Sequence, residues 1–424
     1  MRLNDISGHY CPSFFNIVLD TNEELPLAVQ KYTATFMHEF IHYLQDLTLP
    51  YNLRLNFTNL ARFLRICESA NKNGNINMPF SDWSDNEKVL NEQMNYTFGN
   101  GCTETRSGFE DIVLKIEFVE KVTSELIEIQ DRKFILYSYN MLFYNSMNML
   151  RTYNLGARDI LEYIAYKIEA KHYQASNMPD LPYRSIDLLF EYYGLSYVSD
   201  DIRLCIAEFC LYNDNPIRTL FNYFLENEEF KQNIRKLSYD KIYKILLTWE
   251  FETTDGVKET LVSKFDRRLQ QFVNILSEQY KGLDGIRRWI LQVNDYVKNE
   301  LTGRFIFSEM YRINQHKFEE FIESVISRVG LPLIMNSKME SGSLQSENMD
   351  TSQFIQFYVL QEFLNTVVYS SNITVCPVKN FCVANCCEYD GRCSINPQNK
   401  SIDGFKCQYI DFLRLYGLSS IEIK

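Results

Sequence analysis

The sequence lacks the long apolar run and the excess of basic residues that mark two large classes of protein. No stretch approaches the roughly 18 consecutive apolar residues that a membrane-spanning helix requires, so we expect no membrane partner. The formal net charge is −12, from 43 Lys and Arg residues against 55 Asp and Glu residues. Because polyanions bind basic surfaces, this charge argues against nucleic acid as a partner.

An export signal is also missing, because the first twenty residues contain no basic start followed by an apolar segment. The chain has 11 cysteines, an odd number that does not suit a framework of disulfides. We therefore expect a cytoplasmic protein whose thiols are reduced or bound to a metal.

Glycine and proline are scarce, at 16 and 10 residues, whereas apolar residues make up 46 % of the chain. Such a composition can bury a large core, and it argues against extensive disorder. Since 424 residues exceed one average domain, we expect three regions. They are a catalytic region at 1–184, a mostly helical region at 185–370 and a cysteine-rich tail at 371–424.

The hydrophobic pattern predicts an α+β fold that is mainly helical, with a small sheet beside one helix. Strands are expected at 14–19 and within 112–139, the latter as a hairpin that turns near residues 130–132. Helices are expected at about 21–47, 157–173 and 353–368, and almost throughout 185–331. The stretch 51–110 reads as polar loop with short helical pieces, and 337–352 as a linker.

Two of the five histidines fall in one short motif, His38-Glu39-Phe40-Ile41-His42. On a helix, the two histidines lie one turn apart on the same face, so both imidazoles can reach a single ion. Glu39 lies to one side of that face, where its carboxylate can take a proton from a water molecule whose pKa the ion has lowered.

An apolar stripe on the same segment supports a helix that is anchored in a core. Phe36, Phe40, Leu44 and Leu47 lie on nearly the opposite side from the histidines, at about 100° per residue. A helix with this pattern packs its stripe inward and presents the histidine face to a cleft.

The segment HEFIHYLQDL, on a helix that follows an apolar strand, resembles the active-site helix of the zincin metallopeptidases. The resemblance implies that His38 and His42 bind Zn²⁺ and that Glu39 is the general base. It also implies a protein or peptide substrate. The alternative is a surface or core helix that merely contains two histidines.

A third zinc ligand is needed, and the motif is not followed by the third histidine that marks metzincins. The resemblance therefore favours a glutamate, as in gluzincins, and Glu162 is the candidate. On the helix at 157–173, Asp159, Glu162 and Glu169 share one face with Ala165, as on the second helix of gluzincins. Either Glu169 or Asp159 could orient a zinc-bound histidine. The alternative is a solvated acidic face.

Other residues are weaker candidates for the site. Glu68, Glu87 and Glu104 are nearer in sequence to the motif, but none has a comparable helical setting. His172 is the least arbitrary candidate for holding an oxyanion, although a structural role is its more ordinary explanation.

Six cysteines gather between residues 376 and 407. Four thiolates in turn-rich loops suit a structural zinc ion, and an iron–sulfur cluster suits them less well. The first choices as ligands are Cys376, Cys382, Cys386 and Cys393. The alternative is a set of buried free thiols.

The leading hypothesis is therefore a zinc-dependent peptidase that hydrolyses peptide bonds of an intracellular protein, with Glu39 as general base. A helical scaffold protein with a non-catalytic metal site at His38 and His42 is the alternative from another class. A zinc hydrolase acting on a non-peptide amide would use the same residues. The sequence carries no signal for an oligomeric state.

Overall fold

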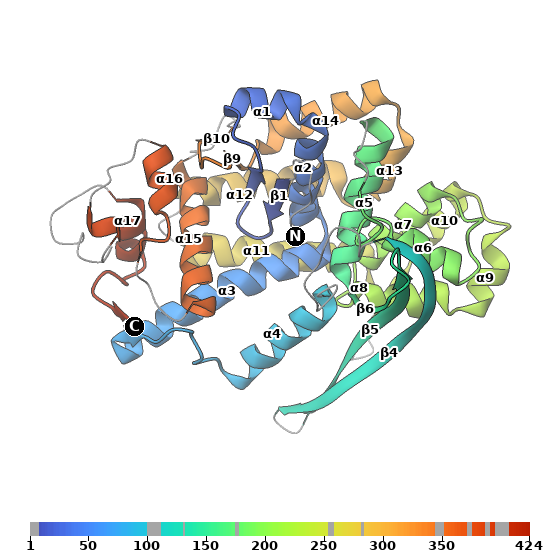
Figure 1. Ribbon diagram of the computed structural model, residues 1–424, viewed down its shortest axis with the longest axis horizontal. Coiled ribbons are helices and arrows are strands. Elements are labelled where there is room, and N and C mark those ends of the chain that lie inside the picture. Colours follow the sequence, from blue (N-terminus) through green and yellow to red (C-terminus); the bar gives the residue numbers. More distant parts are fainter. Residues whose placement is uncertain are drawn as a thin grey trace.

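The computed structural model describes residues 8–99, 112–129, 132–173, 178–252, 258–280, 284–343, 352–370, 375–385, 391–394 and 407–424. It is mainly helical with small sheets, which confirms the expected α+β class at that level (Figure 1). None of the described helices combines the length and apolarity that crossing a membrane requires.

The segment around the histidine motif forms two helices rather than the single helix that we expected. They are α1 (Leu25–Lys31) and α2 (Thr33–Thr48), which meet at Tyr32. Pro26 lies in the first turn of α1 as expected, but no side chain caps this helix. Helix α2 ends at Thr48, two residues before Pro50, and carries the whole motif.

The expectation of polar loop with short helical pieces between residues 51 and 110 understates the helix in the described part. Helix α3 (Pro50–Asn73) runs for 24 residues, and α4 (Asp85–Phe98) follows it. Leu53, Leu60 and Phe63 give α3 a buried face, but fully buried polar residues such as Asn56 interrupt the apolar pattern. The short strand β3 (Asn75–Ile76) pairs with β11 (Glu422–Ile423) at the end of the chain.

A four-stranded sheet flanks α2, in the order β1-β2-β9-β10. Its strands are β1 (Gly8–Cys11), β2 (Asn16–Leu19), β9 (Leu333–Asn336) and β10 (Ser341–Gly342). Strand β2 is shorter than the expected 14–19, because Phe15 lies in the turn after β1 with a φ of 50°. Since β2 pairs in parallel with β9, the sheet joins residues that are far apart in the sequence.

The expected hairpin is present and is longer than the sequence pattern indicated. Strands β4 (Val113–Ile129) and β5 (Arg132–Asn145) pair antiparallel, with Ile129 opposite Arg132. The expected turn residues Gln130 and Asp131 lie outside the described residues. Strand β6 (Leu150–Leu155) completes the sheet and leads into α5 (Ala157–His172), while the hairpin projects from the body (Figure 1).

The segment after residue 185 is largely helical as expected, apart from the short hairpin of β7 (Glu250–Glu252) and β8 (Lys258–Thr260). Its α-helices are α6 (Ser185–Tyr192), α7 (Asp200–Cys210), α8 (Pro216–Leu220), α9 (Glu228–Ile234), α10 (Tyr239–Leu247), α11 (Leu261–Asn274), α12 (Asp284–Tyr296), α13 (Ile306–Arg312) and α14 (Gln315–Val329). Three π-helical segments extend α8, α11 and α12: η1 (Phe221–Leu225), η2 (Ile275–Gln279) and η3 (Val297–Leu301).

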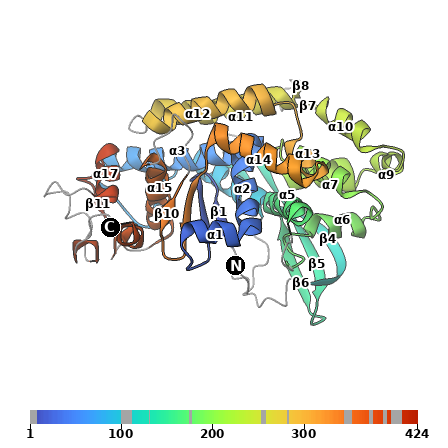
Figure 2. The same ribbon diagram turned by 90° about the horizontal axis from the view of Figure 1, so that it is seen from above.

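Helix α15 (Ser352–Tyr369) matches the expected helix before the tail. The described tail contains α16 (Lys379–Ala384), the 3-10 turn η4 (Gly391–Ser394) and α17 (Gln408–Leu415). One hydrophobic core extends from Tyr10 to Ile421, and helices α2 and α5 lie side by side near the middle of the body (Figures 1 and 2).

Candidate metal centre

Helix α2 is amphipathic, as its sequence predicted. Phe36, Phe40, Leu44 and Leu47 are each at most 5 % exposed, so the stripe lies in the core. The histidine face is turned toward α5, which packs directly against α2. The stripe therefore fixes the rotation of α2, and this rotation aims both imidazoles at the acidic face of α5.

Helix α5 begins where two backbone segments come into close contact. A Cβ added to Gly156 would lie 2.3 Å from the carbonyl of Phe98, so only glycine fits here. Asp159 accepts hydrogen bonds from the Gly156 N–H at 2.9 Å and from the Tyr153 hydroxyl at 2.7 Å. These contacts fix the start of the helix and so the positions of the glutamates that follow it.

Three side chains from α2 and α5 meet at one point, with donor atoms that all lie within 4.8 Å of one another: His38, His42 and Glu162. Oε2 of Glu162 lies 3.2 Å from Nε2 of His38 and 3.4 Å from Nε2 of His42. The two Nε2 atoms are 3.2 Å apart. Among the described residues, this is the single group of three such side chains close enough to share an ion.

Hydrogen bonds on the far side of each imidazole fix which nitrogen faces the centre. Nε2 of Gln45 donates to the Leu161 carbonyl at 3.1 Å, so its Oε1 faces Nδ1 of His42 at 2.7 Å. Nδ1 of His38 lies 3.0 Å from Oε2 of Glu169, a carboxylate that is almost fully buried. In the neutral form that binds a metal, each imidazole therefore carries its proton on the outward Nδ1, and both Nε2 lone pairs point toward the centre.

The electrostatic environment favours positive charge between the helices. Burial lowers the pKa of His38, but its hydrogen bonds with Glu162 and Glu169 outweigh this effect and raise the pKa well above its ordinary value. Burial also opposes the charge of His42, yet the nearby Glu162 carboxylate raises its pKa. Protons on these imidazoles compete with a metal ion, and the same carboxylates that hold the protons would hold a divalent cation.

Glu39 lies beside the centre and contacts the first strand of the sheet. Its side chain is 6 % exposed, and burial raises the pKa of its carboxyl group above the ordinary value. The backbone N–H of Tyr10 in β1 donates a hydrogen bond to this carboxylate. Glu39 is thus held between the imidazoles and the edge of the sheet.

A buried aspartate fixes β1 against α2. Oδ2 of Asp46 accepts hydrogen bonds from the Tyr10 hydroxyl at 2.9 Å and from the Ser13 N–H at 2.7 Å. Its Oδ1 accepts one from Asn52 at 3.0 Å. Burial raises the pKa of Asp46 to about 6. This carboxylate therefore sets where the Tyr10 N–H meets Glu39.

Tyr183, just before α6, faces the centre from a third direction. Its ring centroid lies 5.9 Å from that of His38 and 5.7 Å from that of Tyr166 on α5. Burial raises the pKa of its hydroxyl, and the charges of Glu162 and Glu39 raise it further. The hydroxyl therefore stays protonated at neutral pH and can donate a hydrogen bond.

Among the residues that contact the two histidines, sequence reasoning missed Gln45 and Tyr183. Gln45 could have been found, because a residue three positions after His42 lies on the same face of the helix. Tyr183 could not, because nothing in its local sequence distinguishes it from the other 27 tyrosines. Of the two acids offered as orienting residues, Glu169 contacts a histidine, whereas Asp159 caps α5.

The weaker candidates lie in other surroundings. His172 stacks on Phe318 with ring centroids 4.1 Å apart, and its Nε2 lies 2.9 Å from the Met310 carbonyl. Glu87 caps the start of α4, and Glu68 pairs with Arg65 on the surface. Glu104 lies outside the described residues. The described environments of these side chains give them structural roles.

The predicted tail zinc site stays a prediction. Cys376, Cys382 and Cys393 are buried, and the fourth candidate, Cys386, lies outside the described residues. The backbone N–H of Cys376 donates to the carbonyl of Cys393 at 2.8 Å, which brings the two short tail segments together.

Comparison with known proteins gives no identification. No family model matches the sequence, and no curated protein or solved structure matches the chain. The chemistry of the centre therefore has to be inferred from its own residues.

Proposed function

We propose that this chain is a zinc-dependent peptidase that hydrolyses peptide bonds of a protein substrate. The observation that carries the proposal is the meeting of two imidazole nitrogens and one carboxylate oxygen within 4.8 Å, with Glu39 next to them on α2. Two nitrogens and one oxygen form a ligand set that catalytic zinc sites use, with a fourth position left for water.

The number of ligands suits zinc, and so do the hydrogen bonds that orient the two imidazoles. His38, His42 and Glu162 would hold the ion, and Glu169 and Gln45 would keep both imidazoles in the tautomer that it requires. When bound, the zinc ion would act as a Lewis acid that lowers the pKa of water and polarises a peptide carbonyl.

Three parts of the chain would perform the remaining tasks. Glu39 would take a proton from the attacking water on its carboxylate and deliver it to the leaving amine nitrogen. The Tyr183 hydroxyl would donate a hydrogen bond to the carbonyl oxygen as negative charge develops there. Among the described strands, β1 pairs with β2 alone, so backbone groups on the side of the Tyr10 N–H can pair with an extended peptide.

The test compares the wild type with Glu39→Gln, both loaded with zinc, on a peptide library made from digested cell protein. Mass spectrometry should find new peptide ends with the wild type alone, while elemental analysis finds the same zinc content in both. A His38→Ala/His42→Ala double variant should contain about one zinc fewer. The peptidase proposal fails if the wild type produces no more new ends than Glu39→Gln.

A non-catalytic metal site in a helical scaffold protein is the second candidate. The observation that favours it is the burial of the centre, since His38 is 4 % and Glu39 6 % exposed. A structural ion is enclosed in this manner. This candidate predicts stoichiometric zinc, an unfolding temperature that falls on chelation, and no difference between the wild type and Glu39→Gln in any cleavage assay.

A further inference from the structure

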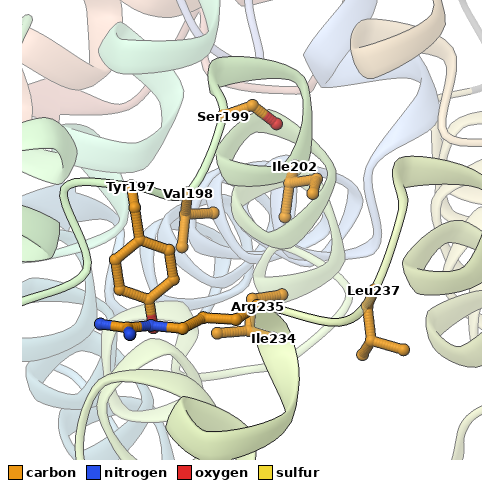
Figure 3. Close-up of a pocket in the computed structure, with 7 residues that line it drawn as sticks. All are labelled: Tyr197, Val198, Ser199, Ile202, Ile234, Arg235 and Leu237. Carbon is orange, nitrogen blue, oxygen red and sulfur yellow. The ribbon is translucent and has the colours of Figure 1, made fainter.

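A pocket far from the metal centre in sequence lies between α7 and the loop that joins α9 to α10 (Figure 3). Its volume is about 560 Å³, which is within the range of sites that bind small ligands or anchor side chains. The aliphatic part of its wall comes from Val198, Ile202 and Ile234, which are each at most 7 % exposed, and Leu237 lies at the rim. The pocket is open toward solvent, so an inserted apolar side chain would lose part of its contact with water here.

A cation stands at the edge of this aliphatic pocket. The guanidinium carbon of Arg235 lies 4.3 Å from the ring centroid of Tyr197, and both side chains line the pocket. The Tyr197 hydroxyl donates to the Lys231 carbonyl at 3.3 Å, which holds the ring in place. Arg235 forms no ion pair with any described carboxylate, so its charge faces solvent at the mouth of the pocket.

The surrounding segment is basic on a protein that is acidic as a whole. Residues 231–244 contain five Lys or Arg residues and one acidic residue, Asp240, which pairs with Arg312. Lys236, next to Arg235, is exposed. Of the acidic residues near the pocket, Glu228 pairs with Lys231 and Asp201 pairs with Arg312. Arg235 and Lys236 are therefore the cations that would attract an acidic partner to the pocket.

We propose that this pocket is a binding site for an acidic peptide segment that inserts one aliphatic side chain. The aliphatic wall would receive the side chain, and Arg235 would pair with a neighbouring carboxylate, preorganised by its stacking on Tyr197. Both parts are needed for specificity, because the apolar contact is non-directional and the charge alone attracts any anion. The site is independent of the metal centre, so its test does not depend on the proposed peptidase activity.

The test is calorimetric titration of the full chain with an acetylated, amidated heptapeptide that has six acidic residues around one central leucine. A second peptide has serine in place of leucine. We expect one peptide to bind per chain, and the serine peptide to bind about five- to tenfold more weakly. Mass spectrometry after the titration verifies that the peptide is intact.

Two protein variants with the same change in charge locate the binding. Arg235→Gln removes the cation at the pocket and should weaken binding about five- to tenfold. Lys241→Gln removes a cation of the same basic segment that does not line the pocket, and it should change affinity less than about twofold. Circular dichroism checks that both variants fold as the wild type does.

Three outcomes would overturn the proposal. The wild type could fail to bind the leucine peptide, the leucine and serine peptides could bind equally well, or the two variants could lose affinity equally. The last two results would identify diffuse attraction between an acidic peptide and a basic surface. Selective loss in Arg235→Gln, together with the preference for leucine, supports the pocket.

Discussion

Glu169 offers the sharpest test of the proposed metal centre, because it contacts His38, a proposed ligand, without being one of the three proposed ligands. Its Oε2 lies 3.0 Å from Nδ1 of His38, and its side chain is 2 % exposed. Replacement by glutamine keeps a similar shape but removes the negative charge, and replacement by alanine removes the acceptor as well. Glu162 remains in place in both variants.

The magnitude follows from what orienting residues contribute in metal sites, where their loss typically weakens metal affinity by about 10- to 100-fold. We expect Glu169→Gln to raise the zinc dissociation constant about tenfold and Glu169→Ala up to about a hundredfold. These changes correspond to about 1.4 and about 2.7 kcal/mol of binding free energy. Zinc affinity falls further in Glu169→Ala because the His38 imidazole then has no acceptor on Nδ1 and is free to rotate.

The assay is competition for zinc against a coloured chelator, with Asp159→Asn as the matched control. Asp159 is also a buried carboxylate on α5, 1 % exposed, but its partners are Tyr153 and Gly156. Its substitution should lower stability and leave zinc affinity within about threefold of the wild type. Equal zinc affinity in Glu169→Gln and the wild type would refute the orienting role, and equal loss in both variants would show a general effect of altering α5.

Three further predictions concern the surroundings of the centre. In zinc-free protein, the free energy of unfolding of the wild type relative to Asp46→Asn should rise by about 2 kcal/mol from about pH 7.5 to about pH 4.5. The sign follows because the folded-state pKa of Asp46 is raised from 3.8 to about 6. The protonated Asp46 carboxyl therefore contributes its full share of stability at low pH, and this share is lost as the pH rises through about 6. A difference in unfolding free energy that does not change with pH in urea titrations would contradict this. Tyr183→Phe should lower kcat about a hundredfold with zinc content unchanged, measured on a cleaved peptide; an unchanged kcat excludes its hydroxyl from the reaction. Phe15→Ala should cost about 3–5 kcal/mol of stability, because the ring is fully buried among five aromatic rings; a loss below about 1 kcal/mol in urea unfolding would show that the core repacks.

The sequence predicts those parts of the site that depend on one helix at a time. The stripe from Phe36 to Leu47 fixes the buried side of α2, and the isoleucines at 160, 164 and 168 fix that of α5. The helical periodicity of the apolar residues therefore places His38 and His42 on one face of α2, and Glu162 and Glu169 on one face of α5. The resemblance to gluzincins then implies that these two faces meet.

The parts that escaped prediction depend on contacts between distant segments or on buried polar groups. Strand β9 pairs with β2 across more than 300 residues, and no local pattern reports such a pairing. The length of α3 was underestimated because Asn52 and Asn56 are buried, where their amides bind Asp46 rather than solvent. A polar residue that is satisfied inside the core has the same local signature as one in a loop.

The 119 residues between His42 and Glu162 are no obstacle to a shared site, because they form separate elements that leave the contact between α2 and α5 intact. The entropic cost of joining two helices by a longer connection grows only slowly with its length. What the centre does require is the register between the helices, and the Gln45 side chain helps to set it by donating to the Leu161 carbonyl. A slip of one helical turn would move Glu162 by about 5.4 Å, which is more than the 4.8 Å that encloses all three donor atoms. The Gln45 side chain therefore contributes to the proposed metal centre in two ways, since it orients His42 and helps to fix the position of Glu162.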